Sequence, residues 1–415
     1  MKRILLENCA LLDPGCGELK EGYNVFVEGG IVREVSDRPI KTSADVVIDV
    51  AGKTLMPGLI DLHVHVTASQ FNVPAQVNMP NVFVTLRTVP ILQGMLQRGF
   101  TSVRDAAGAE FALADAVEKG LVEGPRLFVS GHALSQTGGH GDMRMRSDFL
   151  ASSELCACGF RVGSFTRVVD GVDAVRKAVR EELQMGAHQI KIMASGGVAS
   201  PTDPVDALGY SLDEIRAAVD EATARNTYVM AHAYTPKAIR RAVECGVRTI
   251  EHGNLVDREA AAVMREHGAY AVPTLVTYEA LVGEGASLGL LPQSVEKAKY
   301  VRNAGIESLQ IWKNAGVKIG FGTDLLGESH RLQSDEFRIR AEVLSASEII
   351  ASATTTAAEI LNMEGRLGVI AEGAIADMLV VDGNPLRDLN CLLGQGERLD
   401  LIMKDGRLYK NRLDR

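Results

Sequence analysis

Short apolar runs alternate with amphipathic stretches along most of the chain. Between Pro57 and about residue 365, strand-like runs end at eight positions: His65, Asp105, His132, Ala194, His232, His252, Thr274 and Asp324. Apolar residues at three- and four-residue spacing predict helices between them, for example over residues 169–184, 211–224, 236–245 and 257–267. Strands that alternate with helices indicate repeated βα units and a parallel sheet. Eight such strands predict a (β/α)₈ barrel over residues 57–365.

The two ends of the chain follow another pattern. Residues 24–28 and 31–35 are strand-like and are separated by Gly29-Gly30, which predicts a hairpin. After Leu367, strand-like runs at residues 376–382 and 401–407 lie among turn residues. We therefore predict one small β-sandwich domain, formed by residues 1–56 and 366–415.

Charge and composition exclude several classes of protein. The 415-residue chain has a formal net charge of −9 and no block of Lys and Arg, so no nucleic-acid surface is expected. No apolar run approaches the roughly 20 residues of a membrane helix. The N-terminus has a charge where a secretion signal would be apolar, and six scattered cysteines do not suggest a disulfide framework. We expect a cytoplasmic protein without membrane or nucleic-acid partners.

Residues that can bind metal occur at several predicted strand ends. His63 and His65 are separated by one residue, so in a strand both side chains point to the same face. His232, His252 and Asp324 end later strands, and the strands of a barrel bring their C-terminal ends together. One such histidine alone is more often structural, and Asp324 alone would suggest a helix cap. The set as a whole predicts a site for divalent metal.

Lys191 lies in the middle of an apolar strand-like run, where a charged ammonium is costly to bury. Either the side chain reaches toward solvent or its charge is changed. A lysine amine that reacts with CO₂ becomes a carbamate anion. Such an anion can bridge two metal ions as a carboxylate does.

The segment Pro57-Gly58-Leu59-Ile60-Asp61-Leu62-His63-Val64-His65 resembles the first-strand motif of the amidohydrolase superfamily. Residues 367–368 and 372–381 are similar to the return into the sandwich in these enzymes. The resemblance implies a distorted (β/α)₈ TIM barrel with two divalent metal ions, for which zinc is expected. It implies that His63, His65 and Asp324 hold one ion, that His232 and His252 hold the other, and that carboxylated Lys191 and a hydroxide bridge them.

Such a pair of ions predicts amide hydrolysis. Two cations that share a water lower its pKa enough to give hydroxide near neutral pH. Asp324 is the natural acceptor of the proton and can pass it to a leaving amine. His140 follows two glycines in the loop after the third strand. Resemblance to prolidase-like dipeptidases and imidazolonepropionase-like relatives implies that His140 stabilises the oxyanion; the alternative is an exposed loop histidine.

Other residues are candidates for binding substrate. Tyr234 can bind a free α-carboxylate through its hydroxyl, and a packing role is equally compatible with its position. Tyr228 shares the face of His232 but lies deeper in the barrel, so it is the second choice. His330 follows Asp324 and belongs either to the pocket or to the surface. Arg144 and Arg146 are assigned to the loop surface rather than to the site.

The overall similarity suggests a dipeptidase that prefers C-terminal proline. Leu288, Leu290 and Leu291 in the apolar stretch 281–292 could surround a proline ring. C-terminal Arg or Lys would need a buried carboxylate, which Glu279 or Glu284 could supply. Cyclic amides and N-acyl amino acids remain alternative substrates. A non-catalytic scaffold is disfavoured because all the ligands are present, and similar proteins lead us to expect a homo-oligomer.

Overall fold

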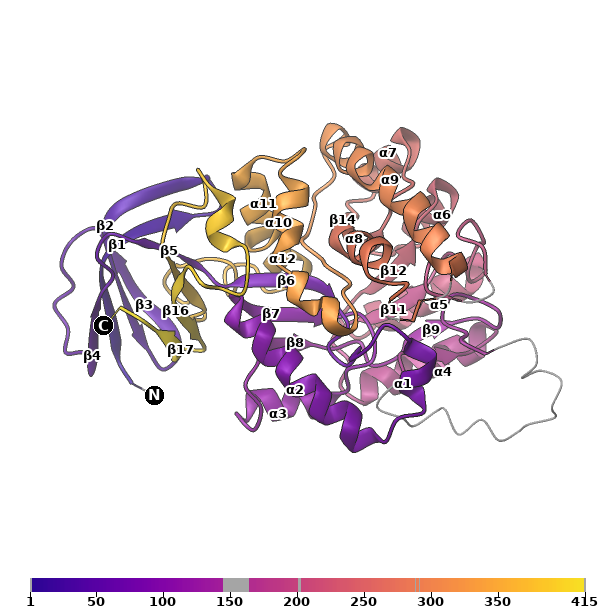
Figure 1. Ribbon diagram of the computed structural model, residues 1–415, viewed down its shortest axis with the longest axis horizontal. Helices are drawn as coiled ribbons and strands as arrows, with labels where there is room; N and C mark the ends of the chain where they lie inside the picture. Colours follow the sequence, from indigo (N-terminus) through magenta and orange to yellow (C-terminus); the bar gives the residue numbers. More distant parts are fainter. Residues whose placement is uncertain (1, 145–163, 201–202, 288, 291, 414–415) are drawn as a thin grey trace.

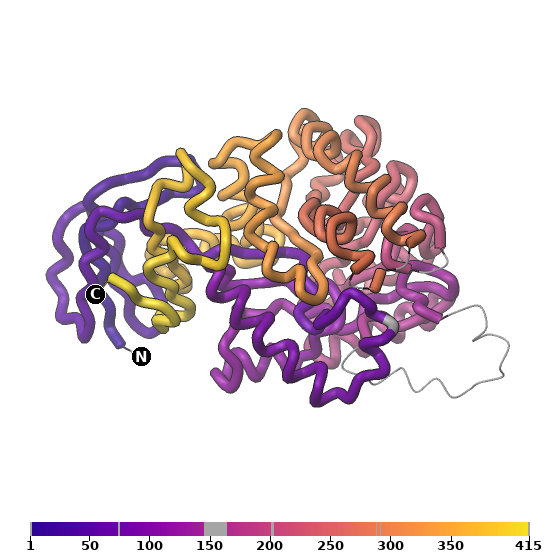
Figure 2. The backbone as a smooth tube through the Cα atoms, viewed as in Figure 1, coloured from indigo at the N-terminus to yellow at the C-terminus, as the bar shows by residue number. Residues whose placement is uncertain are grey.

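A computed structural model describes residues 2–144, 164–200, 203–287, 289–290 and 292–413. The chain forms two parts that lie side by side, a β-sheet part and a larger barrel surrounded by helices (Figure 1). Both termini lie in the sheet part, as the backbone trace in Figure 2 shows. The predicted TIM barrel with a small β-sandwich is therefore confirmed.

The sandwich is one eight-stranded sheet built from both ends of the chain. Its strands are β1 (Ile4–Asp13), β2 (Glu18–Glu28), β3 (Ile31–Ser36), β4 (Val46–Asp49), β5 (Thr54–Pro57), β15 (Met378–Val381), β16 (Leu399–Lys404) and β17 (Arg407–Asn411). Strand β1 pairs first with β4 and then with β5, and Asn8, with φ of 56°, lies at the change of partner. This change allows the sheet to enclose its own apolar core, which contains Leu6, Val25 and Val380.

The barrel strands are β6 (Leu59–Val64), β7 (Phe100–Asp105), β8 (Arg126–Phe128), β11 (Ile190–Met193), β12 (Val229–Ala233), β13 (Thr249–His252) and β14 (Tyr270–Val272). Neighbouring strands pair in parallel within β6–β8 and within β11–β14. His188 N donates to Val129 O at 2.7 Å and joins the two groups. The eighth segment, residues 319–324, is irregular. Gly320 N donates to Ala271 O and Asp324 N donates to His63 O, each at 2.8 Å, and these bonds close the ring.

The third strand differs from the sequence prediction. It ends at Phe128 rather than at His132, because the backbone is irregular from Val129 to His132, with Gly131 at φ of 67°. Two additional strands follow, β9 (Ala133–Ser135) and β10 (Thr166–Val168), and β9 pairs with β11. His132 therefore lies in a connecting turn, where its backbone N donates to Glu182 Oε2 at 3.1 Å.

Helices surround the barrel. The longer ones are α2 (Asn81–Gln97), α3 (Phe111–Glu118), α4 (Val172–Gln184), α5 (Leu212–Thr223), α6 (Pro236–Glu244), α7 (Arg258–Glu266), α8 (Leu275–Gly283) and α9 (Pro292–Ala315). The shorter ones are α1 (Val73–Val77), α10 (Asp335–Arg340), α11 (Ala346–Ser352), α12 (Thr355–Ile360) and the 3₁₀ helices Gly327–Leu332 and Leu389–Leu392. Side-chain caps at Ser211, Thr235 and Asp257 start α5, α6 and α7 where the sequence predicts them. Among the described helices, none has the length and apolar character to cross a membrane.

A shared apolar core joins the sheet to the barrel. Leu379 and Ile402 from the sheet pack in one cluster with Phe100 and Phe321 from the barrel. The contact is close at the start of β7, where a Cβ added to Gly99 would lie 2.9 Å from Leu379 Cδ1. The two parts are therefore held together by buried apolar surface.

We expect Leu379→Ala to lower the free energy of unfolding by about 2–5 kcal/mol, because Leu379 is fully buried and its truncation leaves a cavity. Urea denaturation followed by the fluorescence of the buried Trp312 measures this change. Leu408→Ala in β17 is the control, because Leu408 is 36% exposed. An equal loss of stability in both variants would contradict the assigned role of the shared core.

Candidate metal centre

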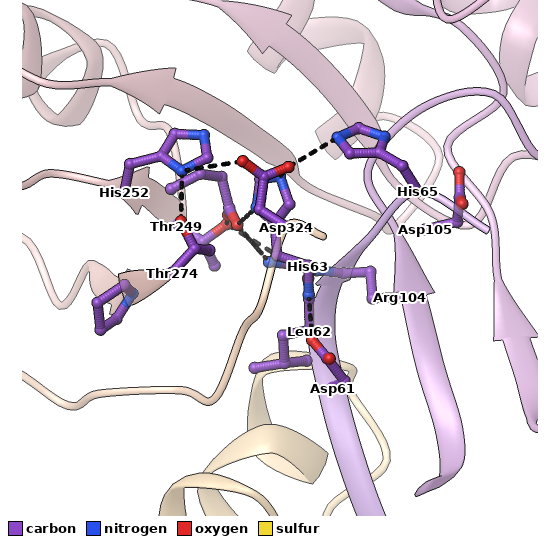
Figure 3. Close-up of polar contacts among 12 residues, drawn as sticks. Asp61, Leu62, His63, His65, Arg104, Asp105, Thr249, His252, Thr274 and Asp324 are labelled. Carbon is purple, nitrogen blue, oxygen red and sulfur yellow. Dashed lines mark hydrogen bonds and ion pairs between the residues drawn. The ribbon is translucent and has the colours of Figure 1, made fainter. Parts of the chain in front are cut away.

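Histidines and one aspartate converge at the C-terminal end of the barrel strands. His63 Nε2 and His65 Nε2 lie 3.5 and 3.2 Å from Asp324 Oδ1, and His252 Nδ1 lies 3.8 Å from Asp324 Oδ2 (Figure 3). One ligand atom from each of His63, His65 and Asp324 falls within 4.8 Å of the others. These three residues are thus close enough to bind one metal ion.

His232 extends this cluster on the side of β12. Its ring centroid lies 4.6 Å from that of His252, which in turn lies 4.8 Å from that of His63. All three rings are buried. The structure therefore brings together every histidine that the sequence proposes as a ligand.

The hydrogen bonds of the rings suit metal binding. Nδ1 of His63, His65 and His252 contacts Glu251 Oε2, Ala107 O and Thr274 Oγ1 at 2.7, 2.9 and 2.8 Å. In His232 the contact is made by Nε2, which lies 3.1 Å from Gly196 O. Each ring thus has one nitrogen oriented by protein and the other available, as is typical of metal-ligating histidines. The residues present therefore fit divalent metal.

Glu251 is a functional residue that the sequence analysis missed. It is fully buried, and its carboxylate accepts hydrogen bonds from Arg104 Nη2 at 2.9 and 3.1 Å while contacting His63. Arg104 also donates to Leu62 O at 2.7 Å. The Arg104–Glu251 ion pair therefore fixes the orientation of His63. The sequence did contain a signal for this residue: Glu251 is an acidic residue inside an apolar strand-like run, immediately before His252.

Two proposed ligands have an unusual backbone conformation. His252 has φ of 69° and Asp324 has φ of 55°, the left-handed region that non-glycine residues rarely adopt. Strict alternation along β13 would place Glu251 and His252 on opposite faces. The left-handed turn at His252 instead directs both side chains into the same cluster. Strain of this kind is often found at functional sites.

Lys191 is 1% exposed, and its side-chain ammonium forms no hydrogen bond or ion pair with a described residue. Burial lowers its pKa to about 8, although the carboxylates of Glu251 and Asp324 raise it. Strand β11, which carries Lys191, pairs with β12 so that Met193 lies opposite His232, and the charge of Lys191 contributes to the low pKa of His63, His232 and His252. Lys191 therefore belongs to the same cluster and does not reach to solvent.

Three of the four proposed histidine ligands are held in the neutral form that binds metal. Burial, together with neighbouring positive groups, keeps the pKa of His63, His232 and His252 well below the ordinary value. Burial lowers the pKa of the fourth, His65, but the hydrogen bond and the charge of Asp324 raise it above the ordinary value. Burial alone would raise the pKa of Asp324, but His63 and His65 lower it. Neutral imidazoles and an ionised carboxylate are the protonation states required of metal ligands.

His140 lies beside the cluster and is not an exposed loop residue. Its ring stacks on His232 with centroids 4.3 Å apart, and its Nδ1 contacts Ser200 Oγ at 2.9 Å. Burial lowers the pKa of His140 to about 4, although Asp203 raises it, so the ring is neutral near pH 7.

Tyr234 is buried next to His252, with ring centroids 5.4 Å apart. Its hydroxyl contacts the Tyr278 hydroxyl at 2.7 Å, and both phenols lie in an apolar cluster with Phe71, Val198 and Leu281. Tyr278 was missed because it lies inside α8 and no motif marks it. The pair places two hydroxyl groups at one edge of the histidine cluster.

Tyr228 and His330 are buried outside the cluster. The Tyr228 hydroxyl lies 3.3 Å from Arg104 Nη1, deeper in the barrel, and no described contact joins it to the histidines. His330 is 5% exposed and its Nε2 contacts Ala68 O at 3.0 Å, so it is not a surface residue. Arg144 pairs with Asp142 at 2.7 Å. Arg146 lies outside the described residues.

The stretch proposed to surround a proline ring comprises the end of α8 and the turn before α9. Leu290 is partly buried against the cluster that contains Tyr234 and Tyr278; Leu288 and Leu291 lie outside the described residues. Glu279 pairs with Arg302 at 3.7 Å and Glu284 with Arg331 at 2.5 Å. All four of these charged side chains are at least 36% exposed. Neither glutamate therefore supplies a buried carboxylate.

Comparison with known proteins places this geometry in a family. The chain is 65% identical to a crystal structure of an amidohydrolase, with a TM-score of 0.97 and coverage of 99% of both chains. It is 59% identical to a prolidase solved in complex with N-methylphosphonate-L-proline, with a TM-score of 0.96 and coverage of 99% of this chain and 100% of the prolidase. It is also 29% identical to an ochratoxinase of Aspergillus niger over 98% of this chain and 87% of that protein.

The sequence model of the Amidohydrolase family matches residues 54–408, which include the whole barrel and most of the C-terminal strands of the sandwich. The match contains each of the proposed metal ligands. The chain belongs to the amidohydrolase family.

Proposed function

We propose that this protein is a binuclear metal-dependent dipeptidase that hydrolyses Xaa-Pro. The observation that carries the proposal is the 59% identity, over nearly the full length of both chains, to a prolidase that binds a proline derivative. The cluster of four histidines with Asp324, next to the buried Lys191, supports the hydrolytic part of this proposal.

His63, His65 and Asp324 would hold one ion, His232 and His252 the other, and carboxylated Lys191 would lie between them. Zinc suits the imidazole-rich donor set. Bound divalent ions supply a water of lowered pKa and polarise the substrate carbonyl.

The surroundings of Lys191 support its proposed carboxylation. An amine whose pKa is about 8 is partly uncharged near neutral pH, and only the uncharged form attacks CO₂. A bond forms between Nζ and the carbon of CO₂, one proton leaves the nitrogen, and the product is a carbamate anion. A buried cation is thereby replaced by an anion among groups that bind metal.

The residues of the chain have separate tasks in hydrolysis. Asp324 accepts a proton from the attacking water at a carboxylate oxygen and gives it to the nitrogen of the departing proline. His140 donates from Nε2 to the carbonyl oxygen as negative charge develops there. Tyr234, with Tyr278, binds the C-terminal carboxylate of the dipeptide.

Proline at the C-terminal position is preferred over Arg or Lys because the tyrosine pair lies among apolar side chains and because Glu279 and Glu284 pair with arginines at the surface. The likeness to an ochratoxinase favours, as a second candidate, a substrate that is not a dipeptide.

We expect the purified protein to contain about two divalent metal ions per chain and to hydrolyse Xaa-Pro with a higher kcat/KM than Xaa-Arg or N-acyl amino acids. Elemental analysis measures the metal, and a panel of these substrates measures the preference. Higher kcat/KM on N-acyl amino acids would favour the second candidate. Absence of bound metal after expression in metal-replete medium would contradict both candidates.

We expect Lys191→Met to lose metal and activity, because the variant has no amine to carboxylate. Metal content and kcat are measured together. Lys404→Met is a matched control: Lys404 is 3% exposed in β16, far from the ligands in sequence, and its amine donates to Gly124 O. If Lys191→Met kept two ions and full turnover, the bridging role would be wrong.

We expect Tyr234→Phe to raise KM for an Xaa-Pro dipeptide by about 10- to 100-fold, the effect of losing one hydrogen bond to a charged group. The corresponding dipeptide amide lacks the carboxylate, so its KM should change little. Tyr270→Phe is the control, because the Tyr270 hydroxyl bonds to Glu359 instead. If Tyr234→Phe changed KM equally for the Xaa-Pro dipeptide and for its C-terminal amide, carboxylate binding by Tyr234 would be excluded.

A further inference from the structure

The loop after β11 lies directly against the ring of His140. A Cβ added to Gly197 would fall 2.1 Å from His140 Cε1 and 2.2 Å from Nδ1, so the glycine backbone covers one face of the ring. His232 stacks against the ring with an interplanar angle of 20°. Glycine at position 197 and the imidazole of His232 therefore fix the plane of His140.

Ser200, from the same loop, holds one edge of this ring. Its hydroxyl oxygen lies 2.9 Å from His140 Nδ1, and the residue is completely buried. Asp203 Oδ2 lies farther from Nδ1, at 3.9 Å, and accepts instead from Gly197 N at 2.9 Å. Ser200 is therefore the direct partner of Nδ1, and no described residue forms a hydrogen bond with Nε2.

Lys297 of α9 anchors this loop. Its ammonium donates to three backbone oxygens, those of Gly197, Ser200 and Asp203, at 3.1, 3.2 and 2.6 Å. One of these carbonyl groups belongs to Ser200 itself, and the other two lie three residues before and three residues after it. The position of the serine hydroxyl thus depends on a residue nearly one hundred positions later in the chain.

The direction of the Ser200 O–H decides which ring nitrogen carries hydrogen. A neutral imidazole has one N–H, and the other nitrogen is an acceptor. The hydroxyl can point to His140 Nδ1 at 2.9 Å or to Gly197 O at 3.4 Å, and the second distance is long for a hydrogen bond of this type. Donation to Nδ1 leaves the hydrogen of the ring on Nε2.

We propose that Ser200 is a positioning residue for His140: its hydroxyl donates to Nδ1, selects the tautomer with hydrogen on Nε2, and so provides the N–H that the substrate carbonyl oxygen needs. The inference rests on the proposed role of His140 in amide hydrolysis. Lys297 supports it by holding the loop. Without the hydroxyl, a neutral ring can place its hydrogen on Nδ1 and lose the donor at Nε2.

Kinetics with Xaa-Pro test the proposal first. We expect Ser200→Ala to lower kcat by about 10- to 100-fold, the usual effect of removing a group that orients a functional histidine, with little change in KM or metal content. Ser200→Thr keeps a hydroxyl and should recover kcat. Ser294→Ala is the control, because Ser294 is fully buried on α9 and its hydroxyl has no hydrogen-bond partner among the described residues. Unchanged kcat in Ser200→Ala would overturn the proposal.

A second measurement does not depend on activity. NMR of the metal-loaded protein labelled with ¹⁵N-histidine reports which ring nitrogen carries hydrogen. We expect hydrogen on His140 Nε2 and none on Nδ1. The His140 signals are assigned as those that are missing in His140→Gln. Ser200→Ala should shift these signals toward the other tautomer. Hydrogen on Nδ1 in the unmutated protein would overturn the proposal. A protein that cleaves no dipeptide but shows the expected tautomer would contradict the proposed function and leave the positioning role supported.

Lys297→Met tests the anchor by removing the ammonium while keeping most of the apolar stem. We expect the same direction of change in kcat and in the His140 signals as for Ser200→Ala. Lys299→Met on the same helix is the control, since Lys299 is exposed and pairs with Glu296. A changed tautomer in both lysine variants would overturn the specific role of Lys297.

Discussion

Closure of the barrel between its first and eighth strands is the constraint on which the site depends. Asp324 N and Thr323 N both donate to the carbonyl oxygen of His63, at 2.8 and 3.2 Å. These bonds join segments more than 250 residues apart and place the Asp324 carboxylate against His63 and His65. Because the eighth segment is irregular, its register depends on these few bonds and on Phe321, which is packed in the shared core.

Burial of charge is the main energetic cost of this arrangement. Arg104 and Glu251 are both completely buried, and such a pair is stable only when further hydrogen bonds satisfy its atoms. Here Leu62 O, Thr249 Oγ1 and His63 Nδ1 satisfy them. Because removing both charges from water costs about as much as their attraction gains, the Arg104–Glu251 pair adds little to stability, but it holds His63 in one orientation. The geometry of the proposed metal ligands therefore depends on residues outside that set.

Residues beyond the ligands separate one member of this family from another. The fold of this chain is similar to that of a prolidase and to that of an ochratoxinase, and in barrels of this kind the loops after the strands carry the differences in function. In this chain the segment after β11 carries Ser200, and Tyr234, directly after β12, bonds to Tyr278 in α8. Both use buried hydroxyl groups whose partners come from distant parts of the sequence.

The sequence by itself determined the barrel, the sandwich of the two chain ends and the ligand types at the strand ends. It could do so because the periods of strands and helices are local, and because His63 and His65 share a face by alternation alone. Only the tertiary structure decided that adjacent Glu251 and His252 reach the same cluster, since the left-handed φ at His252 overrides alternation. It also decided the early end of β8 and the contacts of Tyr278, Ser200 and Lys297, because these depend on packing between segments far apart in the chain, which no local pattern records.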